Sequence, residues 1–471
     1  MKKRLLGSAG VSLLATSLAA QTAPLTPEQQ SFRALYQEMV ETDTSITTGS
    51  CTLLADKIEA HLKEAGYTPD QITRFAIPEK PKEGGLVLVY PGTSKTLKPM
   101  LLLGHLDVVV AKREDWTRDP YKLIEENGYF YGRGTSDMKA MDAAWVDMMI
   151  RFKRSGYKPK RTIKMALTCG EETTGAFDGA EWLAKNKPDL IAAEFALNEG
   201  GGGRTDGHGK VVLMTMHVGE KAVQNYRIET TNPGGHSSVP VPDNAIYELA
   251  DALKKVAAYE FPVQLSDTTR SYFARVGKTQ PGELGAAMVA ISKDPTDKAA
   301  LAILDKDRSY HSMLRTTCVA TLLDGGHANN ALPQRAGANI NCRIFPGNSV
   351  EATQAALAKA IDDPKVTVTL VQPIRPPAVP PPLDPKIFGP AEKLVAKYYP
   401  GVPFVPAMST GGTDGIFLEG IGIPVYGPPG GYGDPDGNGA HGLNERRSVA
   451  SVYGGRDFLT DLVKTYAEGP K

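Results

Sequence analysis

The sequence is poor in cysteine, has no excess of charge of either sign and, after its first twenty residues, lacks long apolar runs. Four cysteines in 471 residues are too few for a scaffold built on disulfides. Lysine and arginine together number 53, as do aspartate and glutamate, which argues against binding nucleic acid or anionic lipid through bulk charge. A membrane-spanning helix needs about 20 apolar residues, and no later segment supplies them. We therefore expect a soluble mature protein with no nucleic-acid partner and no membrane span.

Several catalytic motifs are missing as well. The chain contains no G-x-S-x-G, no P-loop, no G-x-G-x-x-G after a predicted strand and no H-E-x-x-H. These absences remove the usual serine-hydrolase, nucleotide-hydrolase, dinucleotide-binding and zincin interpretations. The chemistry has to come from acids and histidines placed elsewhere in the chain.

The N-terminus predicts a cleavable signal peptide over residues 1–20. Lys2–Arg4 form a positive region, residues 5–20 are apolar and small, and Ser17–Ala20 offer a cleavage site. The alternative is an uncleaved anchor, but the apolar run is too short and too rich in glycine and serine for one. We expect a periplasmic or secreted protein, in which the cysteines can form disulfides.

Apolar runs that alternate with amphipathic segments predict an α/β sheet covered by helices. Strands are expected within residues 86–90, 100–110, 161–169, 193–197 and 423–426, and helices within 27–66, 138–154, 179–187 and 386–398. A second pattern, with paired strands at 316–323 and 336–345, interrupts this series. A segment with seven prolines at 373–385 is typical of a connector. The predicted division is a catalytic domain in two parts, 24–219 and 373–471, with an inserted α+β domain at 220–372.

Acids and histidines follow the predicted strands, where open α/β sheets bind ligands. His105 and Asp107 lie two residues apart, so Asp107 could orient a metal-bound His105; the alternative is a buried histidine satisfied by an acid. Asp137 precedes a helix and could instead be its N-cap. Glu171 and Glu172 repel each other unless a cation or proton is shared; the alternative is a solvated acidic loop.

Two further residues complete the set. Glu199 directly follows a predicted strand, and His441 lies in a glycine-rich loop, where a lone histidine is usually a surface residue. Mixed nitrogen and oxygen ligands suit zinc in a two-metal site better than calcium or magnesium. In such a site His105 and either Glu172 or Glu199 would sit on separate metals, with Asp137 bridging.

In chain order, nine segments resemble the dinuclear zinc amidohydrolases and metallopeptidases of clan MH, the family of aminoacylase, glutamate carboxypeptidase, acetylornithine deacetylase and succinyl-diaminopimelate desuccinylase. The segments are GHLDVV, GRGTSDMKA, GEETTG, NEGG, GGHSSVP, NNALP, RIFPG, GGTDG and HGLNER. They cover nearly the whole mature chain. Cys169 and Gly170 stand where much of the family has a proline or glycine and an acid. The resemblance implies a zinc-exopeptidase-like catalytic domain with a helix-covered, mostly parallel sheet, interrupted by a lid that is also the dimerisation domain.

The resemblance also implies two zinc ions per protomer, with cobalt as a substitute. The implied ligands are His105, Asp137 as the bridge, Glu172, Glu199 and His441. How these ligands pair with the two metals stays open. Glu171 resembles the general base, and Asp107 resembles the acid that supports the ligands.

In the inserted domain, the resemblance implies that His236 reaches the active site of the partner in a homodimer. Asn330 and Arg343 match positions that contact the carboxylate end of the substrate, and guanidinium is suited to that contact. Gly412 and Thr413 lie in a loop like one that contacts substrate near the metals. The segment 261–312 is longer than expected for such a lid, and the sequence assigns it no role.

The sequence therefore predicts an exported zinc enzyme that hydrolyses an amide or peptide bond next to a free carboxylate, in the manner of a carboxypeptidase or dipeptidase. An N-acyl-amino-acid deacylase of the same family is the alternative, and an inactive periplasmic peptide-binding protein is a more remote one. Two disulfides are considered: Cys318 with Cys342, on strands expected to pair, and Cys51 with Cys169.

Overall fold

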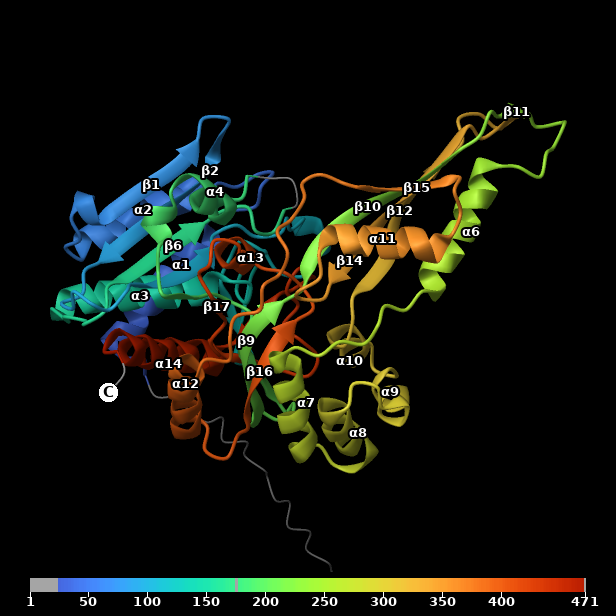
Figure 1. The fold of residues 1–471 in the computed structure, drawn as a ribbon. Helices are drawn as coiled ribbons and strands as arrows, with labels where there is room; N and C mark the ends of the chain where they lie inside the picture. The colour runs from blue at the N-terminus through green and yellow to red at the C-terminus, as the bar shows by residue number, and fades with distance from the viewer. Residues whose placement is uncertain (1–23, 174–176, 470–471) are drawn as a thin grey trace, which may run out of the picture.

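The five predicted strands of the catalytic part and one that was not predicted, β1, form a six-stranded sheet (Figure 1). This computed structural model describes residues 24–173 and 177–469, so the predicted signal peptide at 1–20 lies outside the described residues. The strand order is β1 (Ile72–Ile77), β2 (Lys80–Tyr90), β6 (Ile163–Thr168), β3 (Met100–His105), β7 (Phe195–Leu197) and β17 (Val425–Tyr426). β6, β3, β7 and β17 run parallel to one another, whereas β2 is antiparallel to both β6 and β1. The prediction of a helix-covered, mostly parallel sheet is confirmed.

Helices cover both faces of this sheet, which explains the continuous apolar runs in its strands. On β3, Met100 and Leu102 pack into the core on one face, and Leu101 and Leu103 into the core on the other. The first face is covered by α1 (Pro27–Glu41), α2 (Cys51–Glu64), α3 (Lys139–Ser155), α12 (Pro385–Tyr398) and α14 (Val449–Ala467). The second is covered by α4 (Gly179–Asn186) and α13 (Gly415–Glu419).

Two smaller sheets extend the catalytic part toward the functional site. One has the order β16 (Phe404–Ser409), β9 (Val211–Glu220), β8 (Gly202–Thr205) and β18 (Tyr432–Gly433). The other has the order β19 (Arg446–Ser448), β5 (Tyr129–Tyr131) and β4 (Ile124–Glu126). Short helical turns complete this part: α5 (Pro188–Ile191), η1 (Pro69–Gln71) and η2 (Arg113–Asp115). Among helices of the described ranges, none has the length and apolar character needed to cross a bilayer.

A separate antiparallel sheet forms the inserted domain, or lid, which projects away from the catalytic part in Figure 1. Its order is β12 (Thr317–Gly325), β14 (Arg335–Ile344), β10 (Ala222–Thr231) and β15 (Val366–Leu370). Its helices α6 (Ala245–Ala258) and α11 (Val350–Ile361) pack on one face, where Tyr226 and Ile340 are buried. At the far tip, β11 (Gly235–His236) pairs with β13 (Ala331–Leu332).

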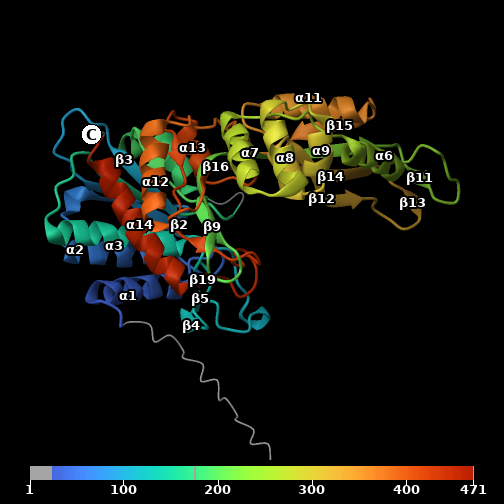
Figure 2. The same cartoon turned by 90° about the horizontal axis from the view of Figure 1, so that it is seen from below.

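The segment 261–312, which the sequence leaves without a role, is helical and lies below the lid in Figure 1. It contains α7 (Asp267–Thr279), α8 (Gly282–Lys293), α9 (Lys298–Leu304) and α10 (Arg308–Met313). Phe273 and Met288 from these helices share a core with Val405 of β16, and α7 packs on that strand. These helices therefore rest on the small sheet of the catalytic part, although they lie inside the inserted domain in sequence (Figure 2).

Both considered disulfides are present. Cys318 and Cys342 face each other in the register of β12 and β14, with Cα atoms 4.1 Å apart. Cys51, the first residue of α2, is bonded to Cys169, which directly follows β6. This second bond ties the segment before Glu171 to α2.

Candidate metal centre and active site

The parallel strands bring three of the predicted ligands to one edge of the main sheet. His105 is the last residue of β3, Glu172 follows β6, and Glu199 follows β7. β6 and β7 flank β3 and run parallel to it, so their carboxyl ends meet at the same edge. This edge is where open α/β sheets place their ligands.

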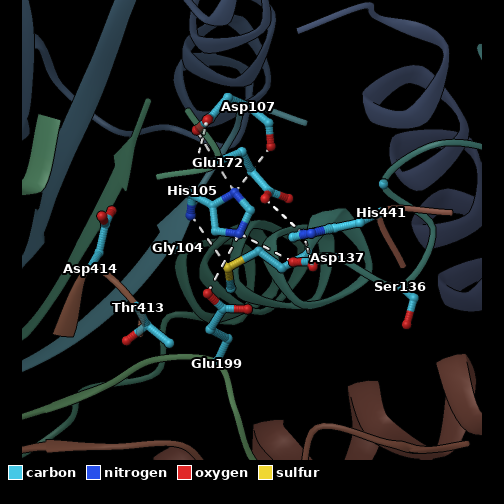
Figure 3. Close-up of polar contacts among 12 residues, drawn as sticks. Gly104, His105, Asp107, Ser136, Asp137, Glu172, Glu199, Thr413, Asp414 and His441 are labelled. Carbon is cyan, nitrogen blue, oxygen red and sulfur yellow. Dashed lines mark hydrogen bonds and ion pairs between the residues drawn. The ribbon is translucent and has the colours of Figure 1, made fainter. Parts of the chain in front are cut away.

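Asp137 and His441 reach the same place from two loops. Asp137 precedes α3, but the N-cap of that helix is Met138 and no side chain caps it, so capping does not explain Asp137. His441 has a backbone φ of 62°, a left-handed conformation within the glycine-rich loop. Figure 3 shows the imidazole of His441 pointing at Asp137 and Glu172.

The five residues form two groups that share Asp137 (Figure 3). In the first group, Nε2 of His105 lies 3.3 Å from Oδ1 of Asp137 and 3.6 Å from Oε1 of Glu199. In the second, Nε2 of His441 lies 3.2 Å from Oδ2 of Asp137 and 2.8 Å from Oε2 of Glu172. Each oxygen of Asp137 thus faces a different group, as a bridging carboxylate would. Glu199 lies beside His105, and Glu172 lies beside His441. This arrangement indicates which ligands would share a metal, a question that the sequence left open.

The donor set fits a pair of cations. Nε2 of His105 and Oε1 of Glu172 are buried and have no hydrogen-bond partner among the described residues, a costly state for polar atoms. Burial raises the pKa values of Glu172 and Glu199 to about 8, because their charged forms lose solvation. Imidazole nitrogens and carboxylate oxygens are ligands that a divalent transition metal accepts, and its charge would replace the protons on these acids.

Glu171 lies beside the centre without belonging to either pair of short contacts. A carboxylate oxygen of Glu171 lies within 4.8 Å of donor atoms on His105 and Glu172. Burial raises the pKa of Glu171 well above its ordinary value. A carboxylate held so close to the ligands, with its basicity raised by burial, has the properties of a general base.

Asp107 supports the centre differently from the sequence interpretation. Nδ1 of His105 lies 3.0 Å from the backbone carbonyl of Asp107 and 3.8 Å from its carboxylate. The carboxylate instead accepts hydrogen bonds from the backbone N–H groups of Gly170 at 2.7 Å and Glu172 at 3.0 Å. The Asp107 carbonyl therefore orients His105, while the side chain fixes the loop that carries the glutamate pair.

One supporting residue was not singled out from the sequence. The fully buried carboxylate of Glu445 accepts hydrogen bonds from the backbone N–H groups of Gly134, Ser136 and Asp137 at 2.7–3.0 Å. It also pairs with Arg133 at 2.8 Å. Glu445 lies in the segment HGLNER, four residues after His441, and this position was the signal in the sequence that could have identified it.

A cleft of about 260 Å³ beside the metal residues holds most of the predicted substrate contacts. Glu171, His441, Arg343, Gly412 and Thr413 line it. The Thr413 hydroxyl donates to Glu220 at 2.8 Å and accepts from Asn198 at 3.2 Å, which fixes its position.

His236 and Asn330 lie elsewhere. Both are exposed at the tip of the lid, where the N–H of Ser237 donates to the Asn330 carbonyl at 3.0 Å. Figure 1 places this tip at the end of the lid remote from the catalytic part. Within one protomer, the structure does not bring these two residues to the metal centre.

The remaining histidines of the chain take part in neither group of the metal centre. His61 pairs with Glu38 at 2.6 Å, and His311 with Asp305 at 3.0 Å. His217 is buried, and burial lowers its pKa to about 4. His208 and His327 are exposed.

Comparison with known proteins identifies the family. The profile described as "Peptidase family M20/M25/M40" matches residues 101–465. The probable carboxypeptidase S-like 2 of Dictyostelium discoideum is 27% identical over 80% of this chain and 74% of its own length. Human N-fatty-acyl-amino acid synthase/hydrolase PM20D1 is 26% identical over 83% of this chain and 79% of its own length. Human aminoacylase-1 is 26% identical over 72% of this chain and 74% of its own length.

Solved structures share the fold. The M20 metallo-carboxypeptidase Sso-CP2 of Sulfolobus solfataricus has a TM-score of 0.69 at 18% identity, covering 94% of this chain and all of its own. The dipeptidase Dug1p of Saccharomyces cerevisiae has a TM-score of 0.65 at 19% identity, covering 94% and 97%. A Bacillus subtilis relative described as a dinuclear metal binding peptidase has a TM-score of 0.56 at 12% identity, covering 94% and 99%. The chain belongs to peptidase family M20/M25/M40 and is a hydrolytic enzyme of the metallopeptidase and amidohydrolase type.

Proposed function

We propose that this protein is an exported, zinc-dependent hydrolase that cleaves an amide or peptide bond next to a free carboxylate, as carboxypeptidases and dipeptidases do. The observation that carries the proposal is Asp137, whose two oxygens face two separate groups of nitrogen and oxygen donors. Separate groups joined by one carboxylate would suit a pair of metal ions. Histidine together with carboxylates favours zinc, with cobalt as a substitute.

The two ions, when bound, would act as Lewis acids that polarise the scissile carbonyl and make a water molecule more acidic. Glu171 accepts the proton of that water and passes it to the leaving nitrogen. Arg343, in the wall of the same cleft, pairs with the free carboxylate of the substrate. Gly412 and Thr413, which line the same cleft, contact the substrate as well.

His236 supplies the remaining donor from the partner subunit of a homodimer. Its Nδ1 accepts a hydrogen bond from the backbone N–H of Ser238 at 3.2 Å, which leaves the proton on Nε2. An Nε2–H group is a donor for the oxyanion of the tetrahedral intermediate. Asn330, beside it at the lid tip, contacts the carboxylate end of the same substrate.

The surface of the lid supports this dimer. β12 is an edge strand, and Val319, Leu322 and Leu323 on it are 60–70% exposed. Ile246 and Tyr247 of the neighbouring α6 are exposed too. An unpaired edge strand with apolar side chains is a surface that soluble proteins normally cover.

Export rests on the pattern of residues 1–20, and both disulfides suit an oxidising compartment. N-terminal sequencing of the protein from the culture medium or periplasm tests this part. A chain that begins at Met1 in the cytoplasm would contradict it.

The substrate is tested with metal-loaded enzyme on two matched series, dipeptides and N-acyl amino acids with the same C-terminal residue. We expect the dipeptides to have the higher kcat/KM. The second candidate is an N-acyl-amino-acid deacylase, favoured by relatives with the names aminoacylase-1 and N-fatty-acyl-amino acid synthase/hydrolase. A higher kcat/KM for the acyl series would select it. Binding without turnover in either series would select the peptide-binding protein instead.

A further inference from the structure

We propose that Lys221 and Arg343 form a subsite for two carboxylates, so that the enzyme prefers substrates whose leaving residue is acidic, glutamate or aspartate. This inference rests on the proposed hydrolysis next to a free carboxylate. It adds the class of leaving residue that the cleft selects.

The two residues share one face of the lid sheet. Lys221 lies between β9 and β10, at the point where the chain enters the lid. Arg343 on β14 is paired with Val223 on β10 and with Thr317 on β12. Side chains of paired residues lie on the same face of a sheet, and Nζ of Lys221 donates to the hydroxyl of Thr317 at 3.4 Å, so Lys221 lies on the face of Arg343. Both cations line the cleft that also contains Glu171, Glu172 and His441.

Neither cation has a counter-charge in the described part of the chain. The side chain of Lys221 is fully buried, and its Nζ donates only to the hydroxyls of Ser312 at 3.0 Å and Thr317 at 3.4 Å. Burial and then the nearby positive charge of Arg343 lower the pKa of Lys221 to about 7. Burial also lowers the pKa of Arg343. A buried lysine beside a half-buried arginine, with no anion for either, is unfavourable, so the site is arranged for anions that arrive with a ligand.

The other charges along this wall are compensated within the chain. Arg375 lines the cleft too, but lies 3.8 Å from the carboxylate of Asp178. Arg315, which also lies near Lys221, pairs with Asp305 at 2.9 Å. Two cations therefore remain for the substrate. One carboxylate is the free group next to the scissile bond, and the second is a side-chain carboxylate of the leaving residue.

The inserted helices give the subsite its position. Ser312 belongs to α10, which is part of the helical segment that rests on β16. Its hydroxyl holds the Lys221 ammonium at the junction between the catalytic part and the lid. The segment that the sequence left without a role thus reaches the substrate cleft through Ser312.

The test compares substrates that differ in one charge. The kcat/KM of the metal-loaded enzyme is measured for N-acetyl-L-glutamate, N-acetyl-L-glutamine and N-acetyl-L-leucine, and for the alanyl dipeptides with the same C-terminal residues. Glutamine has nearly the shape of glutamate but leaves one cation unpaired. Since a charge-assisted hydrogen bond is strong when desolvated, we expect glutamate to exceed glutamine by about tenfold or more.

Lys221→Met removes the charge and keeps the length of the side chain. We expect it to reduce the glutamate preference to about threefold or less, with little change in kcat/KM for leucine. Lys278→Met, a change at an exposed lysine of α7, removes the same charge from the surface and should keep the wild-type preference. Thermal unfolding checks that both variants fold. Product inhibition of the wild type by L-glutamate and L-glutamine gives a second measurement that needs no variant.

The outcomes separate this inference from the proposed function. Turnover with equal kcat/KM for glutamate and glutamine overturns the inference and leaves the hydrolase intact. An equal loss for all three substrates in Lys221→Met, with the glutamate preference unchanged, also overturns it. No turnover of any derivative, by contrast, contradicts the proposed function.

Discussion

The carboxylate of Glu445 accepts a hydrogen bond of 3.0 Å from the backbone N–H of Asp137, a residue that faces both groups of the metal centre. The same carboxylate accepts hydrogen bonds from the backbone N–H groups of Gly134 and Ser136 and forms an ion pair with Arg133. One buried acid near the C-terminus therefore fixes the conformation of the loop that presents the shared ligand. Side chains that hold ligands in this way commonly set metal affinity.

We expect Glu445→Gln to weaken metal binding by about 10–100-fold, because one amide N–H₂ must face backbone N–H donors and the loop shifts. The free energy of unfolding should fall by about 3–5 kcal/mol, since Arg133 loses its buried partner. Competition with a chelator measures the affinity, and denaturant unfolding the stability. Glu64→Gln on the surface of α2 is the matched control. Normal metal affinity in a folded Glu445→Gln protein would contradict this role.

The elements of the main sheet could be predicted because local physics decides them. Residues 86–90 and 100–103 are apolar without interruption, since these parts of β2 and β3 are buried on both faces. His105 and Glu199 could be proposed as ligands because each stands at or just after the end of such a strand. Because β3 and β7 are parallel, both residues lie at the carboxyl-terminal edge of the main sheet.

Long-range placement could not be read from the sequence. The helices α7–α10 lie between lid strands in chain order, yet their apolar faces pack on β16, more than ninety residues later in the chain. The carboxylate of Asp107 turns toward the N–H groups of Gly170 and Glu172, because the loop after β6 passes beside it. Both outcomes depend on segments brought together by folding, which spacing along the chain does not encode.

The neighbouring acids Glu171 and Glu172 should have separate roles. Glu171→Gln should keep both metals and lose about 10²–10⁴-fold in kcat, because the proton acceptor is gone. Glu172→Gln should lose metal, because its Oε2 lies 2.8 Å from Nε2 of His441 and faces the same group. Elemental analysis after dialysis and steady-state kinetics measure the two effects.

Each of these variants serves as the control for the other, since both replace one acid by its amide in the same loop. Near-normal turnover in Glu171→Gln would remove Glu171 from the mechanism. Full metal occupancy in Glu172→Gln, and likewise in His105→Ala or His441→Ala, would overturn the ligand assignment.

The two disulfides should differ in their effect on stability. In the chain-entropy account, closing the loop of 118 residues between Cys51 and Cys169 contributes about 5 kcal/mol, and closing 24 residues between Cys318 and Cys342 about 3.5 kcal/mol. The double variant Cys51→Ala/Cys169→Ala should therefore have the lower Tm of the two double variants. Thiol titration of the unfolded, unreduced protein should find no free thiol. Four free thiols would reject both bonds.

The position of His236 leads to a complementation test. The lid tip that carries His236 is remote from the metal centre of its own chain, so each active site of a twofold dimer would borrow the histidine of its partner (Figure 1). Glu171→Ala protomers have a dead centre but an intact His236. His236→Ala protomers have an intact metal centre but lack the histidine that would complete the partner's active site. We expect each homodimer to be nearly inactive.

Mixing the two variants in equal amounts should restore about a quarter of wild-type activity, because about half of the dimers are mixed and each mixed dimer has one complete site. Subunit exchange is verified with two affinity tags, and activity is measured on the whole mixture; the mixed dimer purified through both tags should have about half of wild-type activity. Glu171→Ala mixed with Glu172→Ala is the control, since neither chain then has a working centre. If His236 acts within its own chain, the mixed dimer gains nothing. That result, or a fully active monomer, would reject the shared active site.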